Sequence, residues 1–315
     1  MVGRDHDGMR LDRFLVSVLP GASRGTVRRL LLRGAVLVEG RQRRKGEPVS
    51  IGERVDVREL AGISAESWAP KPAPQLEIPV LHEDGDMIVV DKPAGIPCHP
   101  LLPEESSNVA SALVARYPEL LKVGGARREA GLCHRLDTST SGVLVFARSE
   151  GALTHLRDQI RRGQGVVKRY LALVEGVDSV ADGEIDMPLT TRGRRMVAVT
   201  EVKGKGASQL LPARTSIRAL AKAEGYSLVA ATISIGRRHQ IRAHLSAIGH
   251  PIAGDELYGA APMEGLDRPF LHASELRLRS PSTGDKLTIS APLPEELREV
   301  LKRVFEESID EILER

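Results

Sequence analysis

One short stretch of the chain brings together residue types that could do chemistry. Residues 133–148 read CHRLDTSTSGVLVFAR, so Asp137 lies between an arginine and four hydroxyl residues. The run GVLVFAR has the composition of a buried strand and could fix the loop before it. Hydroxyls and backbone donors of DTSTSG could hold the carboxylate. A lone aspartate in such a loop is also often a turn or cap residue, so this motif alone leaves both interpretations open.

Several familiar cofactor and catalytic motifs do not occur in the sequence. Cys98 and Cys133 are 35 residues apart and cannot form a CxxC metal pair. His239, His244 and His250 are spaced by five and six residues, which does not align them on one helix face, so we interpret them as structural or hydrogen-bonded. No GxGxxG, phosphate-binding loop or GxSxG motif is present. We therefore expect no metal, no cofactor and no serine hydrolysis.

The charge of the chain is unevenly distributed. The 315 residues, a length typical of about two domains, carry a net charge of +3. Residues 1–59 hold 13 Lys and Arg against 8 Asp and Glu, whereas the rest holds 32 against 34. This polarity favours a basic unit that binds phosphates, joined to a nearly neutral body, although a merely solvated basic surface would look the same.

Cysteine content and hydropathy indicate the compartment. The chain has two cysteines and begins with the charged stretch MVGRDHDGMRLDR. Its longest nearly apolar stretch, YSLVAATISIG, is far shorter than the roughly 18 residues of a candidate membrane span. We expect a cytoplasmic, monomeric protein with no membrane role.

The basic unit is predicted to contain two helices and a small hairpin. One helix presents apolar residues spaced three or four apart, namely Leu11, Phe14, Leu15, Val18 and Leu19. A second helix follows, with Ser23 as its cap and Gly34 at its end. Its buried side is formed by Val27, Leu30 and Leu31. The segments AVLVEG and EPVSIGERVDV read as short strands separated by RQRRK.

The larger part of the chain is predicted to be α+β with a large mixed or antiparallel sheet. We place the first domain at residues 1–62, a proline-rich linker at 63–75 and the second domain at 76–315. Strand-like runs outnumber helices and read IPVLHE, MIVVDK, GVLVFAR, RYLALVEG and YSLVAATISIG. One helix is expected between the cap Ser149 and Gly163. The last is one amphipathic helix through Leu297, Val300, Leu301, Val304, Phe305, Ile309, Ile312 and Leu313.

Residues 9 to about 58, which begin MRLDRFLVSVLPGASRGTVRRLLLRGAVLVEGRQ, resemble the S-four RNA-binding domain. In that family the second helix and the following turn bind structured RNA through its phosphates, contacts that position a protein without reading sequence. The resemblance implies that RNA is bound by the basic residues of this helix and turn, namely Arg24, Arg28, Arg29, Arg33, Arg41, Arg43, Arg44 and Lys45.

Five motifs in order make residues 76–295 resemble the RluA-type pseudouridine synthases. They are VLHEDGDMIVVDKPAGIPCHP, HRLDTSTSGVLVFAR, KRYLALVEG, GRRHQIRAHLSAIGHPIAGDELYG and RPFLHASELRL. The resemblance implies that Asp137 is the essential aspartate and that Arg242 pairs with it. It assigns displacement of the target base to Arg135, and packing on the uracil with late proton removal to Tyr170. The remaining substrate contacts are assigned to His134, Ile241 and Leu245.

The reaction that this family catalyses suits these residue types. Conversion of uridine to pseudouridine breaks the bond from the ribose to a ring nitrogen and joins the same sugar to ring carbon five. A carboxylate must add to the sugar or take a neighbouring proton, and an adjacent guanidinium favours its anionic form. A glycosidase needs two carboxylates and a water, whereas here the detached base is the second nucleophile. The nucleotide must also leave its stack, at a cost of a few kcal/mol.

Some positions depart from the usual family pattern, and the target is not fixed by the motifs. Thr138, Ser139, Arg238 and Cys98 are unusual where they stand; they could alter which RNA is accepted or be neutral. We expect large-subunit ribosomal RNA as the substrate. Transfer RNA, with the same chemistry, and a non-catalytic RNA-binding assembly factor are the alternatives.

Overall fold

The computed structural model describes residues 1–315 except 20–21, 23, 59–68, 103, 126, 177–181, 200–209, 307 and 315. The expected cap Ser23 and residues 63–68 of the expected linker therefore lie outside the described residues. No helix in the described ranges is both long enough and apolar enough to cross a membrane.

Residues 2–57 form a small unit around their own apolar cluster. Helices α1 (Leu11–Val18) and α2 (Arg24–Leu32) pack over β1 (Val36–Val38), which pairs antiparallel with β2 (Val55–Val57). A short 3₁₀ turn, η1 (Arg4–His6), precedes them. The two helices and the hairpin were predicted. Val18, expected on the apolar face, is 41% exposed because α1 ends there, beyond the cluster.

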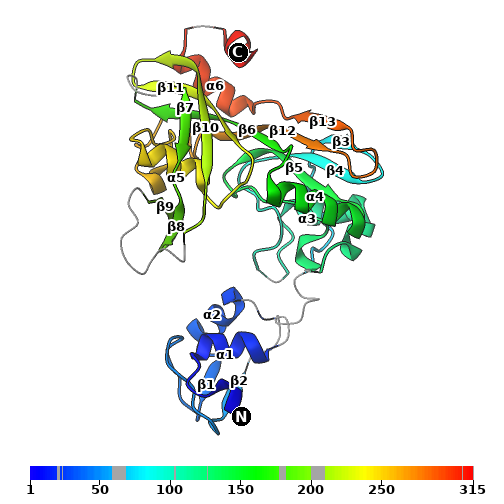
Figure 1. The fold of residues 1–315 in the computed structure, drawn as a ribbon, viewed down its shortest axis with the longest axis vertical. Helices are drawn as coiled ribbons and strands as arrows, with labels where there is room; N and C mark the ends of the chain where they lie inside the picture. The colour runs from blue at the N-terminus through cyan, green and yellow to red at the C-terminus, as the bar shows by residue number, and fades with distance from the viewer. Residues whose placement is uncertain are drawn as a thin grey trace.

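A nine-stranded mixed sheet forms the body of the larger part of the described chain (Figure 1). Its strands are β3 (Val80–Glu83), β4 (Met87–Lys92), β5 (Ser141–Ala147), β6 (Val167–Glu175), β7 (Gly183–Asp186), β10 (Arg214–Ala223), β11 (Tyr226–Ile233), β12 (Leu271–Arg279) and β13 (Lys286–Ser290). The order is β3-β4-β5-β12-β6-β11-β10-β7, with β13 beside β12. Among the described strands only β5 and β12 pair in parallel, which confirms the predicted α+β class with a mixed sheet. A separate pair is formed by β8 (Leu189–Arg192) and β9 (Arg195–Ala198).

Two helices cover opposite faces of the β4–β5 end of the sheet because side chains alternate along a strand. Ile88, Val90, Leu144 and Phe146 face α3 (Val109–Arg116), and Met87, Val89, Val143 and Val145 face α4 (Glu150–Arg162). Helix α4 begins and ends as predicted. The Ser149 hydroxyl accepts a hydrogen bond from Ala152 N, and Gly163 adopts a φ of 69°. Figure 1 shows both helices near β5 and α5 (Gln240–Ala247) near β10.

The last segment forms two helices, not the single helix that was predicted. Helix α6 spans Glu295–Val304 and α7 spans Ile309–Glu314. Phe305 leaves α6 in an extended conformation (φ −116°, ψ 137°) and is itself buried. Apolar spacing records which side chains are buried and cannot show that the backbone turns between them. The remaining elements are short 3₁₀ turns, η3 (Pro118–Lys122), η4 (Arg127–Glu129) and η6 (Glu256–Tyr258).

Candidate active site

A cavity of about 1640 Å³ opens where the loop before β5, strand β6 and the start of α5 meet. These segments approach one another because β5, β12, β6 and β11 are neighbours in the sheet, and α5 follows β11. Six of the seven residues predicted to be catalytic or to bind substrate line the cavity, namely His134, Arg135, Asp137, Tyr170, Ile241 and Arg242.

Leu245 is the exception among the predicted residues. It is fully buried in the main apolar cluster and does not line the cavity. Ile241 and Leu245 share one face of α5, but Leu245 lies one turn further along the helix, inside the core. We therefore correct its assignment: Leu245 supports α5 and does not contact the cavity.

Asp137 lies at the end of a chain of charges that starts in the protein interior. Arg242 Nη1 donates to Asp137 Oδ2 over 3.2 Å. On its other side Arg242 donates to both carboxylate oxygens of Asp255, over 2.6 and 2.7 Å. The exposed fractions of the side chains fall from 25% for Asp137 to 8% for Arg242 and 1% for Asp255. The buried carboxylate thus fixes the guanidinium, and the guanidinium faces the accessible carboxylate.

The Arg242 guanidinium is positioned by aromatic packing as well as by charge. Its Cζ lies 5.0 Å from the centre of the Tyr258 ring, and the Tyr258 hydroxyl is bonded to the backbone of Met196 in β9. Burial by itself would lower the pKa of Arg242, but hydrogen bonds and charge from Asp255 and Asp137 outweigh burial and raise it. Arg242 is therefore a permanent cation in this site.

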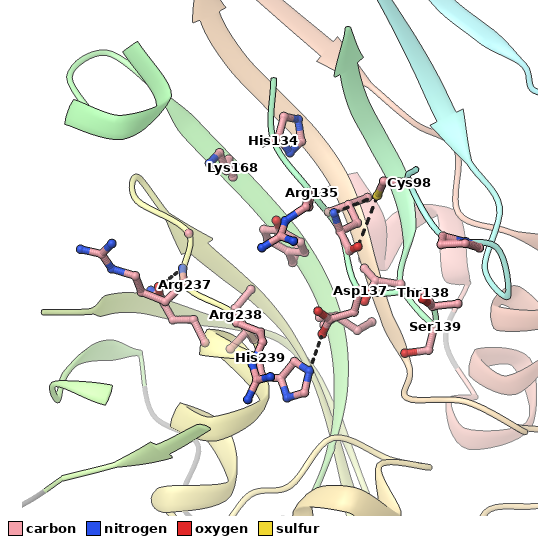
Figure 2. A pocket seen from close by; sticks show the side chains of 18 of the residues that line it. Cys98, His134, Arg135, Asp137, Thr138, Ser139, Lys168, Arg237, Arg238 and His239 are labelled. Carbon is pink, nitrogen blue, oxygen red and sulfur yellow. Dashed lines mark hydrogen bonds and ion pairs between the residues drawn. The ribbon is translucent and has the colours of Figure 1, made fainter. Parts of the chain in front are cut away.

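His239 also faces the Asp137 carboxylate. Its Nε2 lies 3.8 Å from Asp137 Oδ2, and its Nδ1 lies 3.0 Å from the Tyr258 hydroxyl. Figure 2 shows the imidazole and the carboxylate pointing toward each other. Burial lowers the pKa of His239, although the Asp137 charge opposes this effect, so the ring is neutral near pH 7. His239 adopts a φ of 52° at the N-cap of α5, which aims it into the cavity.

The other two histidines of that segment have ordinary structural contacts. His244 Nδ1 lies 2.8 Å from the Thr215 hydroxyl and its Nε2 lies 2.9 Å from Met187 O. His250 Nδ1 lies 2.8 Å from Glu175 O. The prediction that these histidines are structural or hydrogen-bonded therefore agrees with the contacts of His244 and His250. For His239 the sequence analysis did not anticipate its position in the cavity.

The Asp137 loop is fixed by hydrogen bonds to two buried cations and to a thiol. Lys92 is fully buried and its ammonium donates to the carbonyl oxygens of Pro93, Ile96 and Thr138, over 2.8, 2.9 and 3.1 Å. Arg268 donates to Ser139 O over 3.1 Å, and Leu136 N donates to Cys98 Sγ over 3.3 Å. The loop is thus fixed mainly through its backbone.

The neighbouring hydroxyls do not bind the carboxylate, although such binding was one of the two interpretations that the motif left open. Among the described residues the Asp137 carboxylate contacts only Arg242 and His239. The Ser141 hydroxyl instead lies 3.0 Å from His272 Nδ1 and accepts from Arg268 over 3.3 Å. A loop sequence shows which hydroxyls are near in the chain but not which way the loop turns them.

Tyr170 forms part of the cavity wall as a nearly buried ring. It projects from β6 and belongs to the main apolar cluster. Burial raises its pKa, and the charges of Asp137 and Cys98 act in the same direction. The phenol is therefore neutral at pH 7. Arg135, two residues before Asp137, is exposed and has no hydrogen-bond or ion-pair partner within the described ranges.

Two family models match the chain. The model of the RNA pseudouridylate synthases matches residues 86–247, and the S4 domain model matches residues 9–55. The chain belongs to the RNA pseudouridylate synthase family. It is therefore an RNA pseudouridine synthase with an S4 domain, as the motifs predicted.

Relatives match over most of their length. "Uncharacterized RNA pseudouridine synthase" of Chloroflexus aurantiacus is 39% identical over 299 residues, covering 94% of this chain and 90% of that protein. Ribosomal large subunit pseudouridine synthase D of Yersinia pestis is 32% identical over 313 residues, covering 93% and 90%. Among solved structures, human RNA pseudouridylate synthase domain containing 4 has a TM-score of 0.56 at 27% identity, over 71% of this chain and 92% of that chain.

The S4 unit has its own groove beside the predicted RNA-binding residues. A groove of about 560 Å³ lies between α2 and the following turn, and Arg28, Arg43, Arg44 and Lys45 line it. Arg43 is engaged within the protein, since it donates to Glu53 over 2.5 and 3.1 Å. Arg24, Arg33 and Arg41 are exposed outside the groove, and the Arg29 side chain lies outside the described part.

Several residues of the site were missed by the sequence analysis. Asp255 and Tyr258 lie in the quoted motif GDELYG and Lys92 in DKPAG, but no spacing rule connected them with Asp137. Lys168, the first residue of the motif KRYLALVEG, also lines the cavity. Asp255, Lys92 and Lys168 each stand next to another charged residue in the motif, so the sequence carried no signal that separated them from exposed charges. Within the described residues no group of three or more His, Cys, Asp or Glu is placed to hold a metal ion.

Proposed function

We propose that this protein isomerises uridine to pseudouridine in large-subunit ribosomal RNA, with Asp137 as the catalytic residue and without a cofactor. The observation that carries the proposal is the Asp137 carboxylate, accessible in a large cavity and held against Arg242. The relatives named ribosomal large subunit pseudouridine synthase D favour ribosomal RNA. We further propose that the protein acts in the cytoplasm as a monomer, with residues 1–62 as an RNA-binding domain.

The proposed reaction rearranges one nucleotide without gain or loss of atoms. The bond from ribose C1′ to uracil N1 breaks, the uracil turns, and C1′ bonds to C5. The proton displaced from C5 is balanced by the proton that N1 takes up. Asp137 acts at the sugar, either by adding to C1′ or by removing a neighbouring proton. Both routes need an ionised carboxylate, which the Arg242 cation 3.2 Å away favours.

Arg242 can stabilise the Asp137 carboxylate because its guanidinium is held in place mainly by Asp255. Two short hydrogen bonds to a buried carboxylate leave only Nη1 directed at Asp137. A guanidinium fixed in this way stabilises charge at Asp137 without reorganising during the reaction. The neutral imidazole of His239 is a second group within reach of the same oxygen.

Tyr170 is better suited to packing on the uracil than to removing its proton. Its ring is nearly buried in the cavity wall, and its raised pKa keeps the phenol protonated at pH 7. An aromatic platform helps to exclude water, which would otherwise hydrolyse a trapped sugar or release free uracil. Proton removal by Tyr170 would require its own proton to be passed on in the same step.

The target uridine has to leave its stack to reach Asp137, at a cost of a few kcal/mol. Arg135 is exposed in the cavity and no described residue pairs with it, so its guanidinium is available to take the place of the extruded base. Phosphate contacts from the S4 groove can offset the cost. These contacts would position structured RNA but would not select the uridine.

The proposal is tested by mapping pseudouridine in total RNA from cells with and without the gene. We expect at least one large-subunit ribosomal uridine to be modified only when the wild-type gene is present. Loss of modification in transfer RNA instead would keep the chemistry and overturn the proposed target. If no RNA changes while the purified protein still binds RNA, the protein acts as a binding factor and the catalytic proposal is wrong.

A further inference from the structure

Lys168 is a nearly buried lysine whose ammonium has no partner in the part of the chain that the structure describes. The residue is 6% exposed and lines the cavity, yet no hydrogen bond or ion pair joins its ammonium to any other described residue. A side chain this buried is normally paired when it is charged. Lys92 shows the usual solution in the same protein, since its ammonium is bonded to three carbonyl oxygens. Lys168 therefore lacks the partners that a structural lysine would have.

The Lys168 side chain belongs to the cavity rather than to the core. It lies two residues before Tyr170 on β6, so both side chains are on the same face of that strand and both line the cavity. Its ammonium lies beside the loop after β11, because a Cβ built on Gly236 would be 3.6 Å from Lys168 Nζ. Burial lowers the pKa of Lys168 to about 8, so at pH 7 most of the molecules still carry the charge.

His134 is the second polar group at this place for which the described residues offer no partner. Its Nε2 is buried and has no hydrogen-bond partner among them. Burial, with a smaller contribution from the Lys168 charge, lowers the pKa of His134 to about 3, so the imidazole is neutral and can donate from one nitrogen. In the view of Figure 2, Lys168 and His134 lie on one side of the cavity and Asp137 and His239 on the other, with Arg135 between them.

We propose that Lys168 and His134 form a subsite for a backbone phosphate of the RNA, next to the uridine on which Asp137 acts. The inference rests on the proposed function and adds a binding site to it. A phosphodiester supplies what both groups lack, since it is an anion with acceptor oxygens for the ammonium and the imidazole. Arg161, at the end of α4, and Arg237 also line the cavity, so the strand would run along a positive wall.

A phosphate fits these observations better than the uracil does. The carbonyl oxygens of uracil are neutral acceptors, whereas a phosphodiester oxygen also carries the negative charge that would neutralise the Lys168 ammonium. The acceptor is also expected at a distance from Asp137, since Lys168 and His134 lie on the other side of the cavity in Figure 2. The flipped base, in contrast, is expected against the Tyr170 ring, which lines the cavity two residues further along β6. The subsite therefore takes the strand that flanks the flipped nucleotide.

The test compares Lys168→Met with Lys168→Arg and with Lys222→Met in the full-length protein. Lys222 is an exposed residue of β10 that does not line the cavity, so its replacement removes the same charge elsewhere. Binding of a short oligouridylate is measured over a range of salt concentrations, because a single strand avoids the cost of flipping. A second oligonucleotide carries neutral methylphosphonates at the linkages that flank its central uridine.

We expect Lys168→Met to weaken oligouridylate binding about tenfold and to reduce the salt slope by about 0.7, the value for one phosphate contact on a single strand. Lys168→Arg should retain most of the affinity. The methylphosphonate should weaken binding to the wild type but not further to Lys168→Met. Melting of Lys168→Met should occur at the same or a higher temperature than the wild type, because an unpaired buried charge has been removed.

Two results would overturn the proposal. One is a Lys168→Met protein whose affinity and salt slope equal those of Lys222→Met. The other is a clear fall in its melting temperature, which would show that Lys168 supports the fold. At saturating RNA, Lys168→Met should still form pseudouridine in an Asp137-dependent manner. RNA binding by Lys168→Met tests the phosphate subsite, whereas pseudouridine formation tests the proposed isomerisation. The two proposals can therefore fail independently.

Discussion

Replacement of Asp255 by Asn should destabilise the fold and slow the reaction together. Asp255 is 1% exposed and accepts two hydrogen bonds from Arg242. Breaking a buried ion pair by removal of one partner costs about 3–5 kcal/mol. Asn keeps one acceptor oxygen and Arg242 keeps its contact with Asp137, so we expect a smaller loss of unfolding free energy, about 2–3 kcal/mol.

The loss is measured as a shift in melting temperature and in turnover. At about 2–4 °C per kcal/mol for a domain of this size, Asp255→Asn should melt roughly 4–12 °C below the wild type. Turnover of an RNA substrate should fall about tenfold or more, because about 1.4 kcal/mol of lost transition-state stabilisation corresponds to a factor of ten. The structural reason is that Arg242 loses part of the paired hydrogen bonding to residue 255 that fixes the orientation of its guanidinium beside Asp137.

Asp186→Asn is the matched control for this experiment. Asp186 also pairs with an arginine, Arg214, over 2.6 Å, but both side chains are exposed. Exposed ion pairs contribute little to stability, so this variant should melt and react like the wild type. If Asp255→Asn behaves like Asp186→Asn, the buried pair does not position Arg242 and the reasoning is refuted.

Three further outcomes follow from the same contacts. Burial lowers the pKa of His272 from 6.5 to about 4, so between these pH values the unfolded chain binds more protons than the folded one. The free energy of unfolding therefore falls as the pH drops from 6.5 to about 4. His272→Gln should reduce that fall, measured by denaturant titrations at these two pH values. Lys92→Met should lower the melting temperature, opposite in sign to Lys168→Met, because three carbonyls lose their donor. Arg28→Ala should reduce the salt slope for structured RNA by about 0.9, whereas Arg54→Ala, outside the groove, should not.

Each of these has a clear contrary result. An unchanged slope of stability against pH would show that His272 does not titrate as a buried base. A Lys92→Met protein that melts normally would mean that the Asp137 loop is held in another way. Equal salt slopes for Arg28→Ala and Arg54→Ala would remove the S4 groove from RNA binding.

Much of the fold could be predicted because local patterns record burial. The alternating and apolar runs gave β4, β5, β6 and β11, and the cap and stop residues of α4 were correct. The break at Phe305 could not be predicted, since a helix that continues and one that ends can bury the same apolar residues. Whether the hydroxyls near Asp137 hold its carboxylate was left open for a related reason, because loop conformation depends on buried groups such as Arg268 that come from distant sequence.

Only those residues of the site that belong to recognised family motifs could be predicted from the sequence. Asp137 and Arg242 are 105 residues apart, and their proximity was expected from the family resemblance rather than from spacing. Asp255 and Tyr258 had no such assignment, although they fix Arg242. Their roles depend on two turns packing after α5, which no local pattern specifies. Lys168 became visible only when its burial and missing partners were known.

The most direct test of the central claim is the pseudouridine content of RNA treated with the wild type and with Asp137→Asn. Asn has nearly the same shape as Asp but cannot be ionised, so RNA affinity and melting temperature should remain close to the wild type. We predict that the wild type forms pseudouridine and that Asp137→Asn forms none above background while still binding the RNA. Pseudouridine formation by Asp137→Asn at a rate near that of the wild type would contradict the account.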